Sequence, residues 1–229
     1  MAFTPEREHH HVDKRLAGAS FGAVARDYEN NAVLQAEVRG RLIDRLALMR
    51  LTPRRILDLG AGTGAAAGPL AKRYRGARIV SLDIAEQMLI EARRTAPRLG
   101  RKRDYLCADA EALPLKDESV DLVFSNLALQ WCNDLDRVFA ELRRSLTRGG
   151  LLLFASLGPD TLRELREAWA AVDEHTHINA FIDMHDLGDA LIRAGFAAPV
   201  MDIEHFTNQE EGVHLVDIRF GDFFTKNTI

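Results

Sequence analysis

Apolar residues follow two different spacings along this chain, and the two spacings alternate. Short continuous apolar runs, which are typical of buried strands, occupy residues 56–59, 77–83, 120–126 and 151–156, and a further strand ends at Cys107. Stretches with an apolar residue at every third or fourth position, which are typical of amphipathic helices, occupy residues 33–49, about 85–95, 135–146 and 184–193. Another helix is expected to open at Pro159-Asp160-Thr161, and Gly149-Gly150 to end the helix before it.

This alternation of strands and helices predicts an α/β fold. Strands joined by helices form right-handed crossovers and therefore a doubly wound, mostly parallel sheet. Two later apolar runs, 199–203 and 213–220, are expected to add a final pair of strands. Ligands bind such sheets outside the carboxyl ends of the strands. The residues that follow each strand are therefore the first candidates for a functional site.

The first of these strand ends is a glycine-rich turn. Asp58 and Leu59 lead into the segment 60–64, Gly-Ala-Gly-Thr-Gly, and small residues that favour a helix follow it. Such a turn exposes amide groups and a helix N-terminus, because glycine adopts unusual backbone angles and leaves room for a ligand. Gly60, Gly62 and Ala65 also satisfy the looser dinucleotide pattern G-x-G-x-x-G/A, which is a weak signal by itself. The turn predicts a nucleotide-like cofactor.

The charge of Asp58 separates two classes of cofactor. A dinucleotide carries an anionic pyrophosphate, which this carboxylate would repel, whereas a cationic sulfonium would be attracted. The segment 56–64, ILDLGAGTG, resembles motif I of the class I S-adenosylmethionine-dependent methyltransferases, whose usual form is close to LDLGxGTG. The resemblance implies S-adenosyl-L-methionine as the cofactor and a seven-stranded, Rossmann-like methyltransferase sheet.

Two further aspartates close the next two strands. Asp83 follows the glycine turn by about 20 residues, the spacing expected for an acid that accepts hydrogen bonds from both ribose hydroxyls. The resemblance implies that Asp109, after the third strand, meets the adenine amino group. Each acid alone is better explained as a loop residue or a helix cap, but three in order favour a cofactor site. The predicted cofactor-binding residues are Asp58, Gly60, Gly62, Gly64, Asp83, Ile84, Asp109, Ala110 and Asn126.

Composition narrows the class of protein. The 229 residues suffice for one α/β domain, and a formal charge of −4 argues against a dedicated nucleic-acid binder. No apolar run approaches the about 18 residues of a membrane span, and the charged N-terminus lacks an apolar signal core. Cys107 and Cys132 show neither a disulfide framework nor metal-ligand spacing. We therefore expect a cytoplasmic protein, a monomer with free thiols, no metal and no membrane partner.

Segments in the second half of the chain narrow the resemblance. Residues 158–165, GPDTLREL, and 183–191, DMHDLGDAL, together with Phe21, Ala25 and Tyr28, are similar to the malonyl-[acyl-carrier protein] O-methyltransferases of biotin synthesis. The similarity extends over roughly residues 21–202. It implies methyl transfer to the free carboxylate of a malonyl thioester, carried by acyl carrier protein or by coenzyme A. The methyl ester would then be elongated like an ordinary acyl chain.

The two ends of the chain set the expected domain limits. Residues 1–15 are polar and are expected to form a mobile tail, residues 16–52 an N-terminal helical lid, and residues 53–229 the methyltransferase domain. From about residue 204 the chain departs from the resembled family, whose members continue with a longer C-terminal stretch. The completeness of the substrate pocket depends on this region.

A malonyl carboxylate needs little activation as a nucleophile. A group with a pKa near about 4 is already ionised at neutral pH, so orientation and desolvation matter more than a general base. The candidates on segments able to cover the strand ends are Tyr28, Arg26, His177, Asn179 and His185. Tyr28 is the first choice, as a lid residue with a phenolic donor, although packing on an amphipathic helix explains it equally well. His185 is better explained as a capping or structural histidine.

Arginine-rich segments offer candidate docking surfaces for an acidic carrier protein. Residues 93–103 and 137–148 each hold several arginines, but an ordinary solvated helix face explains each cluster more simply.

Three other functions remain open at this point. A relative from mitochondrial complex I assembly carries a similar Asp-Thr-Leu segment and hydroxylates a protein arginine. Another small-molecule methyltransferase, acting on a quinone or other prenylated ring, would share the glycine motif. A non-catalytic protein that senses S-adenosylmethionine is the alternative from a different class, suggested by the altered C-terminus. An assay of methyl transfer to malonyl-carrier protein distinguishes the carboxyl O-methyltransferase hypothesis from these three.

Overall fold

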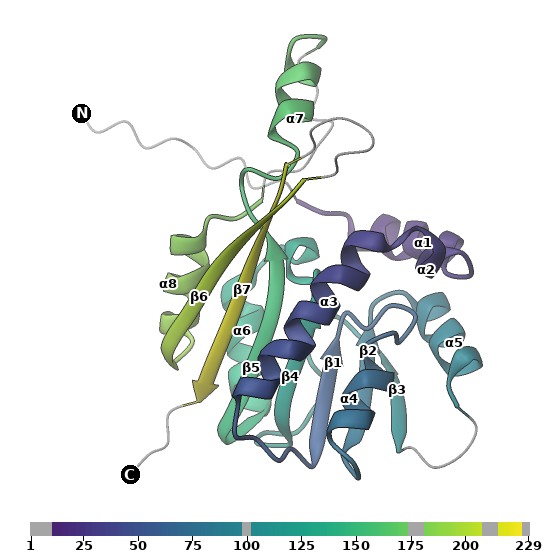
Figure 1. The fold of residues 1–229 in the computed structure, drawn as a ribbon, viewed down its shortest axis with the longest axis vertical. Helices are drawn as coiled ribbons and strands as arrows, with labels where there is room; N and C mark the ends of the chain where they lie inside the picture. Colours follow the sequence, from purple (N-terminus) through teal and green to yellow (C-terminus); the bar gives the residue numbers. More distant parts are fainter. Residues whose placement is uncertain (1–10, 98–101, 174–180, 208–214, 226–229) are drawn as a thin grey trace.

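The computed structural model describes residues 11–97, 102–173, 181–207 and 215–225. Within these ranges, five parallel strands form the centre of the molecule (Figure 1). Their spatial order is β3 (Arg103–Cys107), β2 (Arg78–Asp83), β1 (Arg55–Leu59), β4 (Val120–Asn126) and β5 (Leu146–Leu157). Beyond β5, the sheet continues with β7 (Leu215–Thr225) and β6 (Phe196–Thr207), both paired antiparallel. The predicted α/β fold with a mostly parallel sheet is confirmed.

Helices cover both faces of the sheet (Figure 1). One face packs against α3 (Val33–Arg45) and α4 (Ala67–Arg73), and the other against α6 (Leu135–Ser145) and α8 (Met184–Arg193). Alternate residues of a strand point to opposite faces, so Ile56 packs with the first pair of helices and Leu57 with the second. The chain order of the strands reverses between β1 and β4. The carboxyl ends of these two strands therefore flank the switch point where ligands bind in such sheets.

The N-terminal residues form helices that lie over this switch point. They are α1 (Lys14–Val24) and α2 (Tyr28–Asn31), and α5 (Glu86–Thr95) packs beside α1. The predicted tail, residues 1–15, extends too far, because Lys14 and Arg15 already belong to the first turn of α1. Asp13 caps that turn, accepting hydrogen bonds from the N–H groups of Arg15 and Leu16. Residues 1–10 lie outside the described residues.

The two adjacent glycines at 149 and 150 do not end a helix. Helix α6 stops at Ser145, and the chain enters β5 at once. Gly149 has a positive φ of 71°, and a Cβ on Gly150 would lie 2.9 Å from the carbonyl oxygen of Thr147. The pairing of β4 with β5 shifts register here. These glycines therefore allow an irregularity inside the strand. In the sequence alone, two adjacent glycines look the same whether they end a helix or interrupt a strand.

The remaining short elements complete the fold. They are two 3₁₀ helices, η1 (Leu46–Leu48) and η2 (Leu129–Trp131), and helix α7 (Arg163–Ala170), which stands beyond the end of the sheet (Figure 1). In the part of the chain that the structure describes, no helix has the length and apolar character needed to cross a membrane.

Candidate active site

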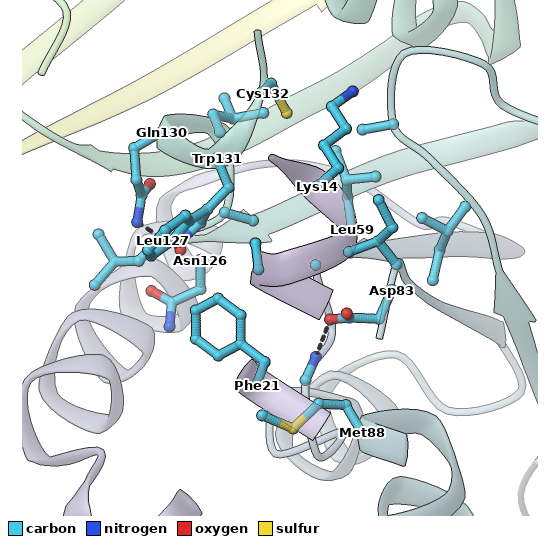
Figure 2. Close-up of a pocket in the computed structure, with 18 of the residues that line it drawn as sticks. Lys14, Phe21, Leu59, Asp83, Met88, Asn126, Leu127, Gln130, Trp131 and Cys132 are labelled. Atoms are coloured by element: carbon cyan, nitrogen blue, oxygen red, sulfur yellow. Dashed lines mark hydrogen bonds between the residues drawn. The ribbon is translucent and has the colours of Figure 1, made fainter. Parts of the chain in front are cut away.

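A pocket of about 260 Å³ lies between the N-terminal helices and the carboxyl ends of the strands. Figure 2 shows its side chains converging from both sides, with Lys14 and Phe21 from α1 and Asp83 and Asn126 from the strands. We use "lid" for α1 and α2, and "floor" for the residues at and just after the carboxyl ends of β1 to β4. Eight predicted site residues line the pocket: Tyr28, Gly60, Gly62, Asp83, Ile84, Asp109, Ala110 and Asn126.

Two glycines of the turn at the end of β1 line the pocket for different reasons. Gly60 has a φ of 67°, and a Cβ there would lie 2.2 Å from the Cβ of Ala128, well inside contact distance. Gly62 has a φ of 53° and lines the pocket, and nothing lies within 4 Å of the place its Cβ would occupy. Glycine is therefore required at Gly60 by the protein itself, and at Gly62 it leaves open space toward the pocket.

Asp83 joins the end of β2 to the glycine turn. Its Oδ2 accepts a hydrogen bond of 2.8 Å from the Gly62 N–H, drawn in Figure 2, and its Oδ1 accepts one of 2.8 Å from Ala85. Burial raises the pKa of this carboxyl, and the backbone donors of Ala85, Gly62 and Ile84 counter that rise. The carboxylate is held in one orientation by backbone groups, with lone pairs left for a ligand.

Asp109, after β3, meets a lid residue. The Lys14 ammonium lies 2.9 Å from Oδ1 and 2.7 Å from Oδ2 of this carboxylate, and Oδ1 also accepts from the Glu111 N–H. Burial tends to raise the pKa of Asp109, but the hydrogen bonds from Lys14 and Glu111 lower it overall. Asp109 is therefore ionised at neutral pH and tied to α1.

Two amide side chains in the pocket carry acceptors that the described residues leave without a hydrogen bond. These atoms are Oδ1 of Asn126 and Oε1 of Gln130, and both are buried. Their amide nitrogens are satisfied, since Asn126 donates to the Gln35 carbonyl and Gln130 to the Leu127 carbonyl. Buried acceptors without partners are costly, so a ligand with N–H or O–H donors suits this pocket.

Aromatic side chains join the lid to the floor. The Phe21 ring on α1 meets Trp131 edge-on with 5.0 Å between ring centroids, and the Tyr28 ring also meets Phe21 edge-on, with 6.3 Å between centroids. Burial, and then the charges of Glu29 and Asp83, raise the pKa of the Tyr28 phenol. Tyr28 therefore remains a protonated hydrogen-bond donor at neutral pH.

Asp58 does not line the pocket, contrary to the sequence-based prediction. It lies inside β1 with 2% of its surface exposed, and burial followed by the charge of Asp83 raises its pKa to about 7. Its Oδ2 has no hydrogen-bond partner among the described residues. The reason is strand geometry: Asp58 pairs with Ser81 and Phe124 in the middle of the sheet, before the turn begins.

Three further predicted residues also lie elsewhere. Gly64 backs onto α5, where a Cβ would lie 3.0 Å from the Cβ of Ala92, so it permits close packing. Arg26 is exposed because its neighbour Ala25 takes the buried position, and it does not line the pocket. His185 is exposed in the first turn of α8, where its N–H donates to the capping Asp183. His177 and Asn179 lie outside the described residues.

Sequence reasoning missed several pocket residues. They are chiefly Lys14, Gln130 and Trp131. The capping residue Asp13 was a signal that a helix starts at Lys14, and the apolar run after β4 placed Trp131 near a strand end. No local pattern pairs Lys14 with Asp109, because 95 residues separate them. Among the described residues, no group of three His, Cys, Asp or Glu side chains could hold a metal ion.

Comparisons with known proteins show the family of this chain. Residues 57–154 match the family model described as a methyltransferase domain. The malonyl-[acyl-carrier protein] O-methyltransferase of Methylovorus sp. is 50% identical over 200 residues, which cover 85% of this chain and 68% of that protein. The protein of the same name from Gallionella capsiferriformans is 49% identical, covering 88% and 71%. This chain belongs to the malonyl-[acyl-carrier protein] O-methyltransferase family. The resemblance drawn from the sequence is confirmed.

Solved structures of more distant proteins share the fold. A SAM-dependent methyltransferase from Thermotoga maritima superposes with a TM-score of 0.66 at 22% identity, covering 90% of this chain and 98% of that one. The phosphoethanolamine N-methyltransferase 2 of Haemonchus contortus, solved with S-adenosyl-L-methionine, gives 0.64 at 19% identity, covering 82% and 52%. At these identities the likeness concerns the fold alone.

Proposed function

We propose that this protein transfers a methyl group from S-adenosyl-L-methionine to the free carboxylate of malonyl-[acyl-carrier protein]. The product is the methyl ester that primes pimeloyl synthesis for biotin. The observation that carries the proposal is about 50% identity to proteins of that name over 85% of the chain. The pocket at the strand ends supports it, since three acidic or amide side chains from different strands line one cavity there.

The pocket residues fit the methyl donor. We assign the sugar hydroxyls to Asp83, whose orientation is fixed by Gly62 and Ala85, and the adenine amino group to Asp109. The unpaired acceptors of Asn126 and Gln130 suit the remaining donor groups of the cofactor. When bound, S-adenosyl-L-methionine supplies an electrophilic methyl group on a cationic sulfur. The acidic side chains of Asp83 and Asp109, which line the pocket, favour a cation nearby, and Asp58 adds to this only when it is ionised.

Orientation of the substrate is the main task left to the protein. The malonyl carboxylate is ionised at neutral pH, so one of its oxygens attacks without loss of a proton. Tyr28 keeps its proton, and we propose that its hydroxyl donates to the oxygen that does not attack. Alignment of this kind can contribute on the order of 7 kcal/mol to lowering the barrier.

The lid excludes water from the reaction. Phe21 and Trp131 place apolar rings over the pocket, and a carboxylate stripped of water is a stronger nucleophile. We propose that the N-terminal helical region, residues 16–52 together with the first turn of α1 from Lys14, carries this lid, and that residues from 53 onward form the methyltransferase domain. We also propose that β6 and β7 complete a seven-stranded methyltransferase sheet. We further propose that the enzyme works as a monomer in the cytoplasm.

The carrier protein is expected to dock through its own acidic surface, with malonyl-CoA as a smaller substitute. The arginine clusters seen in the sequence are less available than their number suggests. Arg94 pairs with Glu91, Arg144 with Glu141 and Asp117, and Arg148 with Glu118. Docking through either cluster therefore stays a prediction.

The test is methyl transfer from labelled S-adenosyl-L-methionine to purified malonyl-carrier protein. A base-labile methyl ester on the carrier is the expected product, and malonyl-CoA in its place shows how much the protein partner contributes. Succinyl-carrier protein tests the length of the acyl group, and unacylated carrier is the control that lacks the carboxylate nucleophile. Binding of S-adenosylhomocysteine without any ester formation would refute the proposed activity and favour a sensor of the cofactor.

A further inference from the structure

The start of α1 is fastened to two floor loops by polar contacts. The Lys14 ammonium lies 2.7 Å from Asp109 and 2.6 Å from Glu111, and its side chain is only 19% exposed. The pKa of Lys14 is raised, because hydrogen bonds to both carboxylates outweigh the burial that would lower it. One ammonium thus bridges two carboxylates at the edge of the pocket and offsets one of their two charges, and it stays charged at neutral pH.

The same place carries a second, neutral connection. The Val12 N–H donates to Oδ1 of Asn133 at 2.7 Å, and Nδ2 of Asn133 donates back to the Val12 carbonyl at 3.1 Å. The Asn133 N–H in turn donates to Oε1 of Glu111 at 2.7 Å, an atom that also faces Lys14. The residues before α1 and the loops after β3 and η2 therefore form one hydrogen-bonded network.

The contacts of α1 are of two kinds. Lys14, in its first turn, makes ionic contacts, and Phe21, two turns later on the same helix, packs edge-on against Trp131. Both side chains line the pocket (Figure 2). A helix fastened at two points along its length is held over the pocket in one position, which neither contact would fix alone.

We propose that Lys14 is a positioning residue for the cofactor: it orients the Asp109 carboxylate and couples closure of α1 to cofactor binding. The inference rests on the cofactor site proposed above, because Asp109 is the floor residue assigned to adenine. Lys14 touches neither the methyl group nor the malonyl group in this scheme. Its effect passes through Asp109 and through the lid, so it should govern cofactor affinity and release.

The first test is S-adenosylhomocysteine binding to Lys14→Met, measured by calorimetry. Methionine keeps much of the length and apolar volume of lysine but leaves Asp109 and Glu111 without their cation. We expect the Kd to rise about tenfold, equivalent to about 1.4 kcal/mol, mostly through faster dissociation. Lys14→Arg retains a cation and should recover most of the affinity. Arg15→Met is the matched control, since Arg15 is exposed and next to Lys14 on the same helix, and its Kd should stay unchanged.

The second test reports the position of the lid directly. The chain has two tryptophans, so Trp169→Phe leaves Trp131 as the single emitter. In that background, Lys14→Met should shift the Trp131 emission to longer wavelength, because the indole gains water when Phe21 withdraws. Saturating S-adenosylhomocysteine should reverse the shift.

Two results would overturn the inference. One is an unchanged Kd and an unchanged Trp131 emission in Lys14→Met. The other is a fall in the thermal midpoint of the ligand-free protein without any rescue of affinity by Lys14→Arg, which would mean a structural role only. Neither result depends on the methyl acceptor. If these binding tests succeed and no ester forms on malonyl-carrier protein, the proposed activity fails while the role of Lys14 stands.

Discussion

The floor and the lid of the pocket hold their side chains by different means. In the floor, the Asp83 carboxylate accepts hydrogen bonds from the N–H groups of Gly62 and Ala85, and the backbone at Gly60 packs closely against Ala128. In the lid, Lys14 reaches a carboxylate 95 residues away. Backbone contacts form with the sheet itself, whereas the lid depends on a few side chains. The floor should therefore be rigid before the cofactor binds, and the lid should be the part that responds.

The hydroxyl of Thr63 adds one more connection between the two regions. Thr63, in the glycine turn, donates to Glu29 on α2, and Arg39 of α3 lies 3.7 Å from the same carboxylate. The second lid helix is thus also held by side chains, of which Thr63 is buried and Glu29 and Arg39 are partly exposed. Variants of the floor should damage folding and binding together, while variants of the lid should change binding or rate and leave the fold intact.

The largest effect is expected from Gly60→Ala. A methyl group 2.2 Å from Ala128, at a φ of 67°, should cost about 4 kcal/mol of the free energy of unfolding and abolish cofactor binding. Urea unfolding and calorimetry measure the two quantities. Gly40→Ala is the control, since Gly40 lies in α3 with nothing within 4 Å of its Cβ position. That variant should gain about 1 kcal/mol. Equal stability of the two variants would contradict a rigid floor.

The buried carboxyl of Asp58 should make stability fall as the pH rises. Its pKa is raised from 3.8 to about 7 in the folded protein, so between those values the folded state keeps a proton that the unfolded state has released. Through this group alone, stability should decrease by on the order of 3 kcal/mol from pH 4 to 7 and then level off, while carboxyls with a lowered pKa, such as Asp109, contribute in the opposite direction.

Asp58→Asn cannot ionise, so most of this pH dependence should disappear in urea unfolding series. Some should remain, because the pKa of Asp83 is raised in the same direction. Asp44→Asn, on the exposed side of α3, is the control for loss of one charge and should keep the slope of the original protein. An Asp58→Asn curve parallel to that of the original protein would refute the assignment.

Asp83→Asn tests the fixed carboxylate of the floor. The amide offers one acceptor oxygen where the carboxylate offers two, so the N–H of Gly62 or of Ala85 loses its partner. We expect S-adenosylhomocysteine affinity to fall by about 2 kcal/mol, or about 30-fold, in calorimetry. Asp104→Asn, which breaks the ion pair with Arg78 at the edge of the sheet, should bind normally. An unchanged S-adenosylhomocysteine affinity in Asp83→Asn would refute the proposal that Asp83 binds the sugar hydroxyls.

The smallest effect is expected from the lid residue Tyr28. Tyr28→Phe keeps the ring that packs near Phe21 and removes only the hydroxyl. The kcat should fall about tenfold, or about 1.4 kcal/mol, with the KM for the methyl donor and the urea midpoint unchanged. Tyr74→Phe is the control, because the Tyr74 hydroxyl is buried without a partner among the described residues and lines a different cavity. An unchanged kcat in Tyr28→Phe would refute the proposed hydrogen bond from the Tyr28 hydroxyl to the substrate and would mean that Tyr28 serves only in packing.

Most of the floor could be predicted from local sequence patterns. The spacing of Gly60, Gly62, Asp83 and Asp109 predicted four residues that do line one pocket. Asp58 and Gly64 belong to the same pattern but do not line the pocket. Asp58 is buried within the sheet, and Gly64 packs against α5. A motif records which residue types a turn needs, but the pleat of a strand and the approach of a helix decide which of them face the ligand.

The sequence by itself determined the order of strands and helices, the parallel sheet and the turn that carries the candidate site, because these follow from spacing and from the conformations open to glycine. Tertiary structure alone decided that Lys14 meets Asp109, that Phe21 meets Trp131, and that Arg26 and His185 stay outside the pocket. Such pairings join segments far apart in the chain. They depend on how whole elements pack, and no local pattern encodes that.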